Sequence, residues 1–350
     1  MRTSNFLATA LIAAGAVTVA QAAEVDQAKI RTAVEKGVAK ALEAGPSFVK
    51  VSGCISCHNN TLPVMAASLA RSRGAAVDQK AEEQQMKTIA GVISGFREPL
   101  LETSYTVPDT QVSVPYVLLA YHAEAAPADD LTAAAVHAIA AKQLPNGSWP
   151  SYINRAPIEN GDIQATALSV RAIQIYGMPG RSVEWKRRIE NARDWLITAT
   201  AKTTEDKATL VSGLYWSGAS EDQIAQAARV LMNEQRSDGG WAQLVTLDSD
   251  AFATGRTLVA MREAGVLIPS DEAYQRGVAY LLDTQQADGT WQVKTRAFPF
   301  QPLKESGFPH GRDQWISAAA TSWASMALAY AMEPPQIADA GKSSKTTSRR

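Results

Sequence analysis

The residues of this chain best suited to chemistry lie close together in its N-terminal part. Cys54 and Cys57 are its only cysteines, two residues separate them, and His58 follows directly. Two thiols at this spacing can bond to the two vinyl carbons of a haem, and an adjacent imidazole can bind the haem iron. The same thiols can form a disulfide instead, with or without a redox role. We therefore predict one covalent haem c on Cys54, Cys57 and His58, with a Cys54–Cys57 disulfide as the alternative.

The N-terminal segment indicates that the chain is exported. Arg2 provides a positive charge, residues 6–20 are apolar and uncharged, and small residues near Ala22/Ala23 suit cleavage. This pattern predicts a secretory signal peptide over residues 1–22, because the apolar run is shorter than the roughly 20 residues that span a bilayer. No later stretch is long enough for a transmembrane segment. We expect a periplasmic or secreted protein, and the periplasm is where bacteria attach haem c.

Composition excludes one class of partner and favours one class of fold. The 34 basic and 35 acidic residues nearly cancel, so the chain lacks the electrostatic footprint of a nucleic-acid-binding protein. Ala is abundant and β-branched alternation is scarce, which favours helices over strands. We expect one domain over residues 24–332 and a disordered tail over residues 333–350, where Ser, Thr, Lys and Arg are frequent.

A repeated turn sequence divides the second half of the chain. Three amphipathic runs end in Gln-x-x-x-Gly-x-Trp, at residues 143–149, 235–241 and 285–291. The Gly suits a left-handed position just after a helix, and the preceding Asn or Asp suits a turn. After each repeat comes an Asp and then a helix rich in Ala, Ser and Thr. These helices begin at Asp162, Asp250 and Asp313.

Extended along the chain, the pattern gives six small-residue helices, each preceded by a more charged partner. The charged partners begin near residues 26, 77, 129, 182, 220 and 271. Asp, Asn or Thr stands at each small-residue start, where such side chains accept backbone N–H groups that a helix leaves unpaired. Small residues allow close approach in a crowded inner ring, whereas charged helices can face water outside. We therefore predict an all-α fold, an α/α toroid of six inner and six outer helices.

The repeats and the closing residues 321–329 resemble the terpenoid cyclase and protein prenyltransferase superfamily, especially squalene–hopene cyclases. The resemblance covers roughly residues 130–332 and extends only in part to the first two helix pairs. It implies the toroid fold and a structural role for the repeat Gln and Trp, which tie neighbouring helices together in that family. It also implies a central cavity whose mouth lies where the inner helices begin, so that the haem segment would lie at this mouth.

Class II terpene cyclases of that superfamily protonate an alkene with an Asp-x-Asp-Asp motif. Asp248-Ser249-Asp250-Ala251 resembles the first three positions and lacks the fourth, which argues against that chemistry here. Asp250 matches the proton donor, but it also occupies the helix-capping place held by Asp162 and Asp313. We expect Asp250 to be a cap, and a cyclase or isomerase that acts through Asp250 is the alternative.

The link from Val293 to Arg312 supplies a candidate for the second iron ligand. It is long and rich in Phe and Pro, and long ordered loops often serve function. His310 stands just before the last inner helix, and closure of the ring would bring that helix beside the one that follows His58. We predict that His310 is the distal iron ligand or a hydrogen-bonding group of the haem pocket. A solvated or capping histidine is the alternative, and Met86 and Met178 are other candidate ligands.

Further links at the predicted mouth carry aromatic and basic residues. These are Tyr105, Trp149, Tyr152, Arg155 and Trp241. The aromatic side chains either line an apolar site or pack in turns, and Arg155 or Arg312 can pair with haem propionates.

The sequence thus predicts an exported haem protein that acts in electron transfer or in haem-based oxidation. Its expected partners are a redox protein and an apolar or isoprenoid-like ligand. Two alternatives stay open: the cyclase that uses Asp250, and a binding module in which Cys54 and Cys57 form a disulfide.

Overall fold

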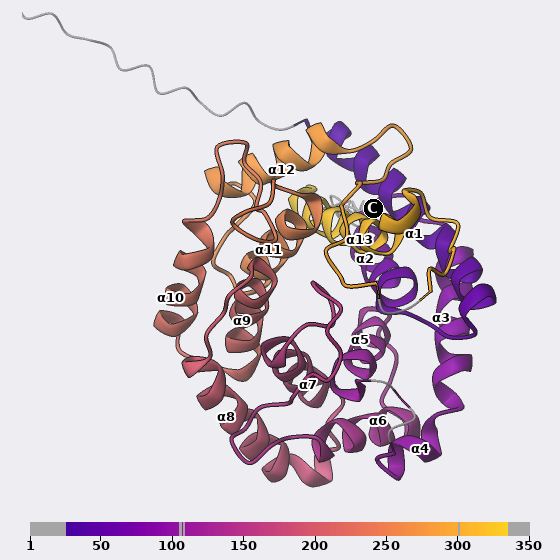
Figure 1. Ribbon diagram of the computed structural model, residues 1–350, viewed down its shortest axis with the longest axis vertical. Helices are drawn as coiled ribbons and strands as arrows, with labels where there is room; N and C mark the ends of the chain where they lie inside the picture. Colours follow the sequence, from indigo (N-terminus) through magenta and orange to yellow (C-terminus); the bar gives the residue numbers. More distant parts are fainter. Residues whose placement is uncertain (1–25, 105–106, 108, 300–301, 335–350) are drawn as a thin grey trace, which may run out of the picture.

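The computed structural model describes residues 26–104, 107, 109–299 and 302–334, drawn in colour in Figure 1. The predicted signal peptide, nearly all of the predicted tail, and Tyr105 lie outside these residues. The described part is built from helices and contains two isolated β-bridges but no strand. None of its helices has the length and hydropathy needed to cross a bilayer.

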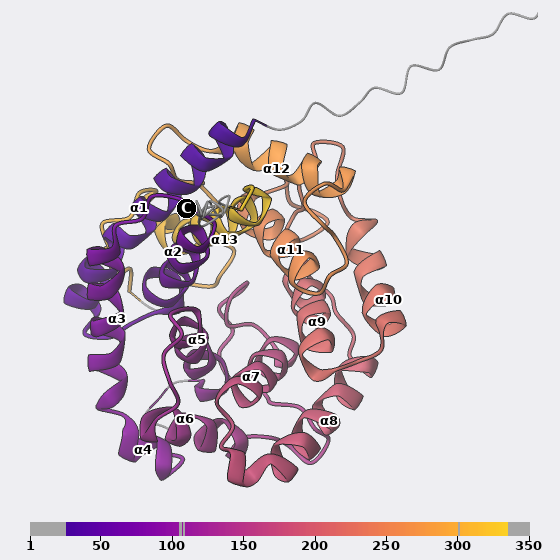
Figure 2. The same ribbon diagram turned by 180° about the vertical axis from the view of Figure 1, so that it is seen from behind.

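Two concentric layers of helices form the molecule (Figures 1 and 2). The inner helices are α2 (Leu62–Ser72), α5 (Thr110–Ala123), α7 (Asp162–Tyr176), α9 (Thr204–Ser217), α11 (Ala251–Glu263) and α13 (Gln314–Ala331). The outer helices are α1 (Gln27–Ser52), α3 (Gln79–Ser94), α6 (Asp130–Ala141), α8 (Ser182–Thr198), α10 (Glu221–Met232) and α12 (Glu272–Thr284). Each inner helix packs against the next, and α13 packs against α2, so the inner ring is closed. The predicted α/α toroid is confirmed. Sequence analysis did not anticipate the short α4 (Arg97–Leu101), which packs against α6.

Small residues allow the inner helices to approach closely, as expected. At Gly255 in α11, an added Cβ would lie 2.6 Å from the backbone nitrogen of Ala324 in α13. No larger residue fits there unless the two helices separate. Buried Ala, Ser and Thr fill most of the remaining contact between inner helices.

The repeated Gln and Trp side chains tie neighbouring outer helices together through backbone carbonyls. Each Trp Nε1 donates to a backbone carbonyl of the outer helix that precedes it. Each Gln Nε2 donates to a carbonyl of its own turn and to a carbonyl of the next outer helix. The Trp acceptors are Ile139, Leu231 and Leu281 (2.6, 2.7 and 2.8 Å), and the Gln acceptors in the next outer helix are Arg188, Ala273 and Ala33 (2.9, 2.7 and 2.9 Å). Because Ala33 lies in α1, the bond from Gln285 joins the last helix pair to the first.

The Asp residues at inner-helix starts do not all act as caps. Asp250 does, because its carboxylate accepts the backbone N–H of Ala253 at 2.9 Å. Asp162 and Asp313 instead accept N–H groups from the preceding links, at Ser151 (2.9 Å) and Thr295 (2.8 Å). These two residues therefore fasten links onto the ring, and the expectation that they cap helices is wrong.

Candidate functional site

The Cys54–His58 segment lies at the end of the ring where the inner helices begin, between α1 and α2. Helix α1 ends at Ser52, and Gly53 adopts a left-handed conformation that turns the chain. A π-helical turn then spans Cys57–Thr61 and leads into α2, and the Ser56 hydroxyl accepts the N–H of Asn59 at 3.1 Å. π-helical turns are rare and occur frequently at functional sites.

The Cys57 sulfur and the His58 imidazole lie close together. Cys54 is exposed, Cys57 is half-buried, and both are free thiols. The Cys57 Sγ atom lies 3.9 Å from Nδ1 of His58. Burial raises the pKa of the Cys57 thiol. Burial, and then the nearby charge of Arg155, lower the pKa of His58 to about 3, so its imidazole is neutral at physiological pH, the form that binds a metal.

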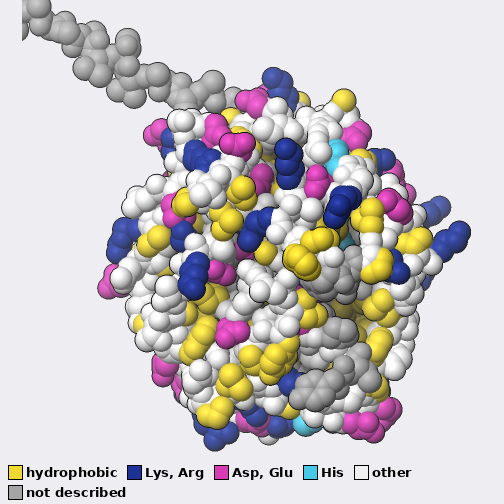
Figure 3. All heavy atoms as spheres, in the orientation of Figure 1, with side chains coloured by type: hydrophobic (Ala, Val, Ile, Leu, Met, Phe, Trp, Pro, Cys, Tyr) yellow, Lys and Arg dark blue, Asp and Glu magenta, His cyan; other side chains and the backbone are white. Residues whose placement is uncertain are grey.

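His58 borders a cavity of about 360 Å³ beneath the 293–312 link. The imidazole ring lies edge-on between Phe48 and Trp315, with ring centres 5.5 and 5.7 Å away. The link contributes apolar side chains, of which Phe298 is 76% exposed. Figure 3 shows this end of the ring, where hydrophobic side chains and Lys and Arg side chains lie side by side.

The residues of this cavity fit a haem. Ligand pockets are mainly apolar with a few placed polar groups, and here the walls combine aromatic and Pro side chains with three bases, Arg155, Lys304 and Arg312. Bases suit the two carboxylates of a haem, and guanidinium groups can bind a carboxylate through two hydrogen bonds. Cys54 and Cys57 do not line this cavity, but they stand in the same segment as the neutral imidazole of His58, and the three residues together would provide the donor set.

His310 is not brought together with His58. Its Nε2 lies 2.9 Å from the Thr290 hydroxyl, and its ring packs edge-on against Phe308 at 6.3 Å. Among the described residues that line the His58 cavity, His310 is absent, as are Met86 and Met178. For His310 to bind iron beside His58, its contact with Thr290 would have to break.

The other residues expected at the mouth divide into two groups. Trp149 and Trp241 are fully buried in the repeat ties, so they pack in turns. Arg155 lines the His58 cavity and forms an ion pair with Glu159 at 3.0 Å. Tyr152 is 69% exposed and lies in a neighbouring surface pocket with Phe298.

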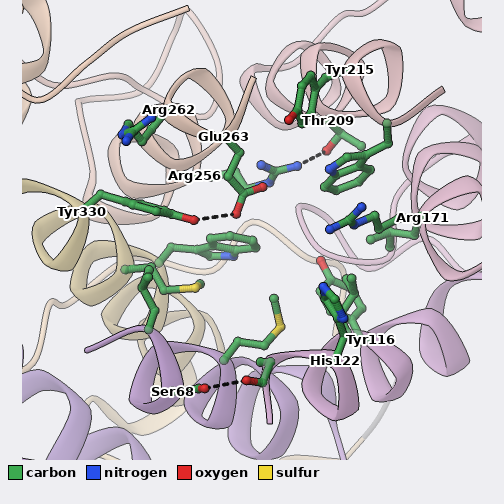
Figure 4. A pocket seen from close by; sticks show the side chains of 18 of the residues that line it. Ser68, Tyr116, His122, Arg171, Thr209, Tyr215, Arg256, Arg262, Glu263 and Tyr330 are labelled. Atoms are coloured by element: carbon green, nitrogen blue, oxygen red, sulfur yellow. Dashed lines mark hydrogen bonds between the residues drawn. The ribbon is translucent and has the colours of Figure 1, made fainter. Parts of the chain in front are cut away.

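A separate cavity of about 560 Å³ occupies the centre of the ring (Figure 4). All six inner helices line it, mainly through their middle and C-terminal parts. It therefore extends toward the end of the ring opposite to the Cys54–His58 segment. Along α13, Trp315 of the first cavity and Trp323 of the central cavity are roughly 12 Å apart at 1.5 Å per residue. The segment lies at the end of the ring where the inner helices begin, as expected. The cavity that it borders is, however, separate from the central cavity.

The central cavity contains a buried charged cluster that sequence analysis missed. Glu205 accepts hydrogen bonds from Gln164 (3.0 Å) and Thr209 (2.8 Å), and its carboxylate lies 3.4 Å from Arg256. The Arg256 guanidinium also stacks over the ring of Trp323 at 4.8 Å. Burial raises the pKa of Glu205, and the charge of Arg256 opposes that rise. Charged residues inside otherwise small, apolar inner helices were the sequence signal for this cluster.

Asp250 does not line the central cavity. Its carboxylate caps α11 and accepts a hydrogen bond from the Gln243 amide at 3.1 Å. Burial raises the pKa of Asp250 to about 6. The carboxylates that line the central cavity are those of Glu205 and Glu263.

No family model matches the chain. Among solved structures, the type II terpene cyclase MstE from Scytonema, without ligand, superimposes with a TM-score of 0.55 at 16% identity, over 88% of this chain and 99% of that one. A variant of MstE in complex with its substrate, geranylgeranyl dihydroxybenzoate, gives 0.54 at 16% identity, over 87% and 98%. A protein from Actinoplanes gives 0.56 at 14% identity, over 85% and 100%. This chain therefore shares the fold of type II terpene cyclases, and fold alone does not carry their chemistry.

Proposed function

We propose that the protein is an exported c-type haem protein that acts in electron transfer or in haem-based oxidation. Cys54 and Cys57 would hold the haem through thioether bonds, and His58 would bind its iron. The central cavity of the toroid would hold an apolar, isoprenoid-like ligand. A separate redox protein would exchange electrons with the haem.

One observation carries the haem proposal. The Cys-x-x-Cys-His segment presents a neutral imidazole to a cavity with aromatic walls and basic residues. A disulfide between Cys54 and Cys57 would explain the spacing of the thiols, but it would not explain the cavity beside His58. The order of residues and their surroundings thus favour the haem.

The chain's own residues have separate tasks in this proposal. A bound haem supplies one-electron chemistry. The thiols anchor it, and burial among Phe48 and Trp315 keeps His58 unprotonated, so that its nitrogen lone pair is available. Arg155 and Arg312 bind carboxylates at the cavity wall. The apolar residues of the link, which are exposed in part, would cover one side of the bound haem.

A second protein ligand would decide between the two redox roles. If His310 also bound the iron, electron transfer would be favoured. If His58 were the iron's one protein ligand, oxidation of an apolar compound would be favoured. An apolar ligand is supported by the aliphatic side chains of the central cavity and by MstE, which shares the fold and binds geranylgeranyl dihydroxybenzoate.

The test is to express the full-length chain together with the cytochrome c maturation machinery. We expect a Soret band that survives acid–acetone extraction, with pyridine haemochrome maxima typical of thioether-linked haem. The Cys54→Ser/Cys57→Ser double variant should lose the extraction-resistant haem. If His310 binds the iron, His310→Ala should change the low-spin spectrum, whereas an unchanged spectrum would end its candidacy. Colourless, correctly exported protein would refute the proposal and leave the disulfide alternative.

A further inference from the structure

The charged residues of the central cavity lie on one side of it. All of the Arg and Glu side chains that line the cavity belong to α7, α9 and α11. The facing wall, from α2, α5 and α13, carries no Arg, Lys, Asp or Glu side chain. It contributes apolar residues such as Met65, Leu69 and Met326 beside uncharged polar ones such as Ser68 and Tyr116. A molecule that fills this space therefore meets an uncharged, largely apolar surface on one side and charges on the other.

The charged wall carries an excess of positive charge. Three arginines line the cavity, Arg171, Arg256 and Arg262, against two glutamates, Glu205 and Glu263. Burial raises the pKa of Glu263, and its protonation would only increase the excess. Burial lowers the pKa of His122, the histidine of the lining, so that it is neutral and does not change the sign.

Two of the arginines form no close ion pair, although the charge of Glu263 acts on Arg171 from across the cavity. Arg256 is paired with Glu205, but neither Arg171 nor Arg262 makes an ion pair within 4.0 Å in the described part of the chain. Arg171 donates a hydrogen bond to the neutral amide oxygen of Gln174 at 2.6 Å. Arg262 has a buried Nε with no hydrogen-bond partner among the described residues. Both side chains are half-buried, so their guanidinium groups are partly removed from water and keep donors that an anion can bind.

Aromatic rings hold the guanidinium groups in place. Arg171 stacks over Trp216 at 5.7 Å and Arg262 over Tyr330 at 5.7 Å. Figure 4 shows Arg171 directed into the cavity, opposite to Glu263 and the Tyr330 hydroxyl that donates to it. Stacking leaves the N–H edges of a guanidinium available for hydrogen bonds, and these edges match the geometry of carboxylate and phosphate oxygens.

We infer that the central cavity binds an amphipathic molecule with an apolar body and one anionic group, a carboxylate or a phosphate monoester. The body packs on the wall of α2, α5 and α13, and the anionic group binds Arg171, while Arg262 adds to the positive charge of the cavity. This inference rests on the proposed assignment of an apolar ligand to the central cavity and is independent of the haem. Cations also suit helix C-termini, but that role alone would give no preference for anionic ligands.

The test compares ligands of one chain length by isothermal titration calorimetry on the full mature protein. The probes are dodecanoate, dodecyl phosphate and dodecanol, used below the concentrations at which they form micelles. We expect at least one of the two anions to bind about tenfold more tightly than dodecanol, as a charge-assisted hydrogen bond to a guanidinium would give. The comparison of dodecanoate with dodecyl phosphate identifies which anionic group the site prefers.

Variants locate the preference. Arg171→Gln should remove most of the difference between the preferred anion and dodecanol, and Arg262→Gln should reduce it. The matched control is Arg187→Gln, because Arg187 is exposed on α8 and does not line the cavity; it should leave all three affinities unchanged.

Two results would overturn the inference, and they differ in what else they affect. Equal affinity of the wild-type protein for both anions and dodecanol would refute the anionic group and leave the apolar ligand standing. Absence of binding by all three probes would refute both. The wild-type comparison needs no variant, so a variant that does not fold cannot obscure the outcome.

Discussion

Replacement of Gly255 by Ala tests whether close backbone contact between inner helices holds the ring together. The added Cβ would lie 2.6 Å from the nitrogen of Ala324, and 2.7 and 2.9 Å from the carbonyl carbon and oxygen of Trp323. These are backbone atoms, so no side-chain rotation can relieve the contact, and α11 must move away from α13. Overpacking of this kind costs about 1–3 kcal/mol, against a gain of about 1 kcal/mol from the higher helix propensity of Ala. We expect a net loss of stability of up to about 2 kcal/mol.

Gly91 in α3 provides the matched control. A Cβ there meets no atom within 4 Å, so Gly91→Ala should stabilise the protein by about 0.5–1 kcal/mol through helix propensity alone. The assay is equilibrium unfolding in urea, followed by far-UV circular dichroism. The two substitutions are chemically identical and should have opposite signs. If both substitutions stabilise the protein, the backbones of α11 and α13 do not approach each other as closely as described.

Three further predictions concern charges and ties, and urea unfolding measures the first two. Glu205→Leu leaves Arg256 buried without its counter-charge and should lower the free energy of unfolding by about 3–5 kcal/mol. The double variant Glu205→Leu/Arg256→Met should recover part of this loss. If the double variant instead loses the sum of the two single-variant losses, the pairing is contradicted. Burial raises the pKa of Asp250 from 3.8 to about 6, so the folded protein binds this proton more tightly than the unfolded chain does, and stability should fall as pH rises through that range. Asp250→Asn keeps an oxygen for the cap and should make the free energy of unfolding depend less on pH in this range. An equally strong pH dependence in the variant would count against the raised pKa. Gln285→Ala removes the hydrogen bond to the Ala33 carbonyl and should lower the free energy of unfolding by about 1–3 kcal/mol. It should also speed amide hydrogen exchange in α1. Unchanged exchange would mean that this bond does not join the last helix pair to the first.

The fold was predictable because it repeats. The Gln-x-x-x-Gly-x-Trp turns mark where outer helices end, and the Gln of each repeat donates to a backbone carbonyl of the next outer helix. Small-residue composition then separates inner from outer helices. The predicted starts of the outer helices agree with the structure to within about two residues, from 26 against Gln27 to 77 against Gln79.

The candidate site was predictable only where it is local in sequence. Cys54, Cys57 and His58 form one motif, so their proximity follows from the chain alone. The position of His310 depends on the path of a long link, and a Thr290 hydroxyl twenty residues earlier holds its ring in a way that no periodicity indicates.

The central cavity depends on contacts between helices far apart in the chain. Glu205 meets Arg256 across 51 positions and Gln164 across 41 positions. No motif joins these residues, because the ring rather than the sequence brings them together. Asp250, which matches the family motif only in part, caps α11 as predicted and does not line this cavity.

The intact mass of the mature protein, purified after expression with the haem-attachment machinery, tests the central claim most directly. Thioether formation adds each thiol across a vinyl group and loses no atoms, so haem attachment predicts a single species heavier than the mature chain by one haem. Cys54→Ser/Cys57→Ser should show the mass of the bare variant chain under the same conditions. A wild-type mass that equals the mature chain, or one lighter by two hydrogens as a Cys54–Cys57 disulfide requires, would contradict the account.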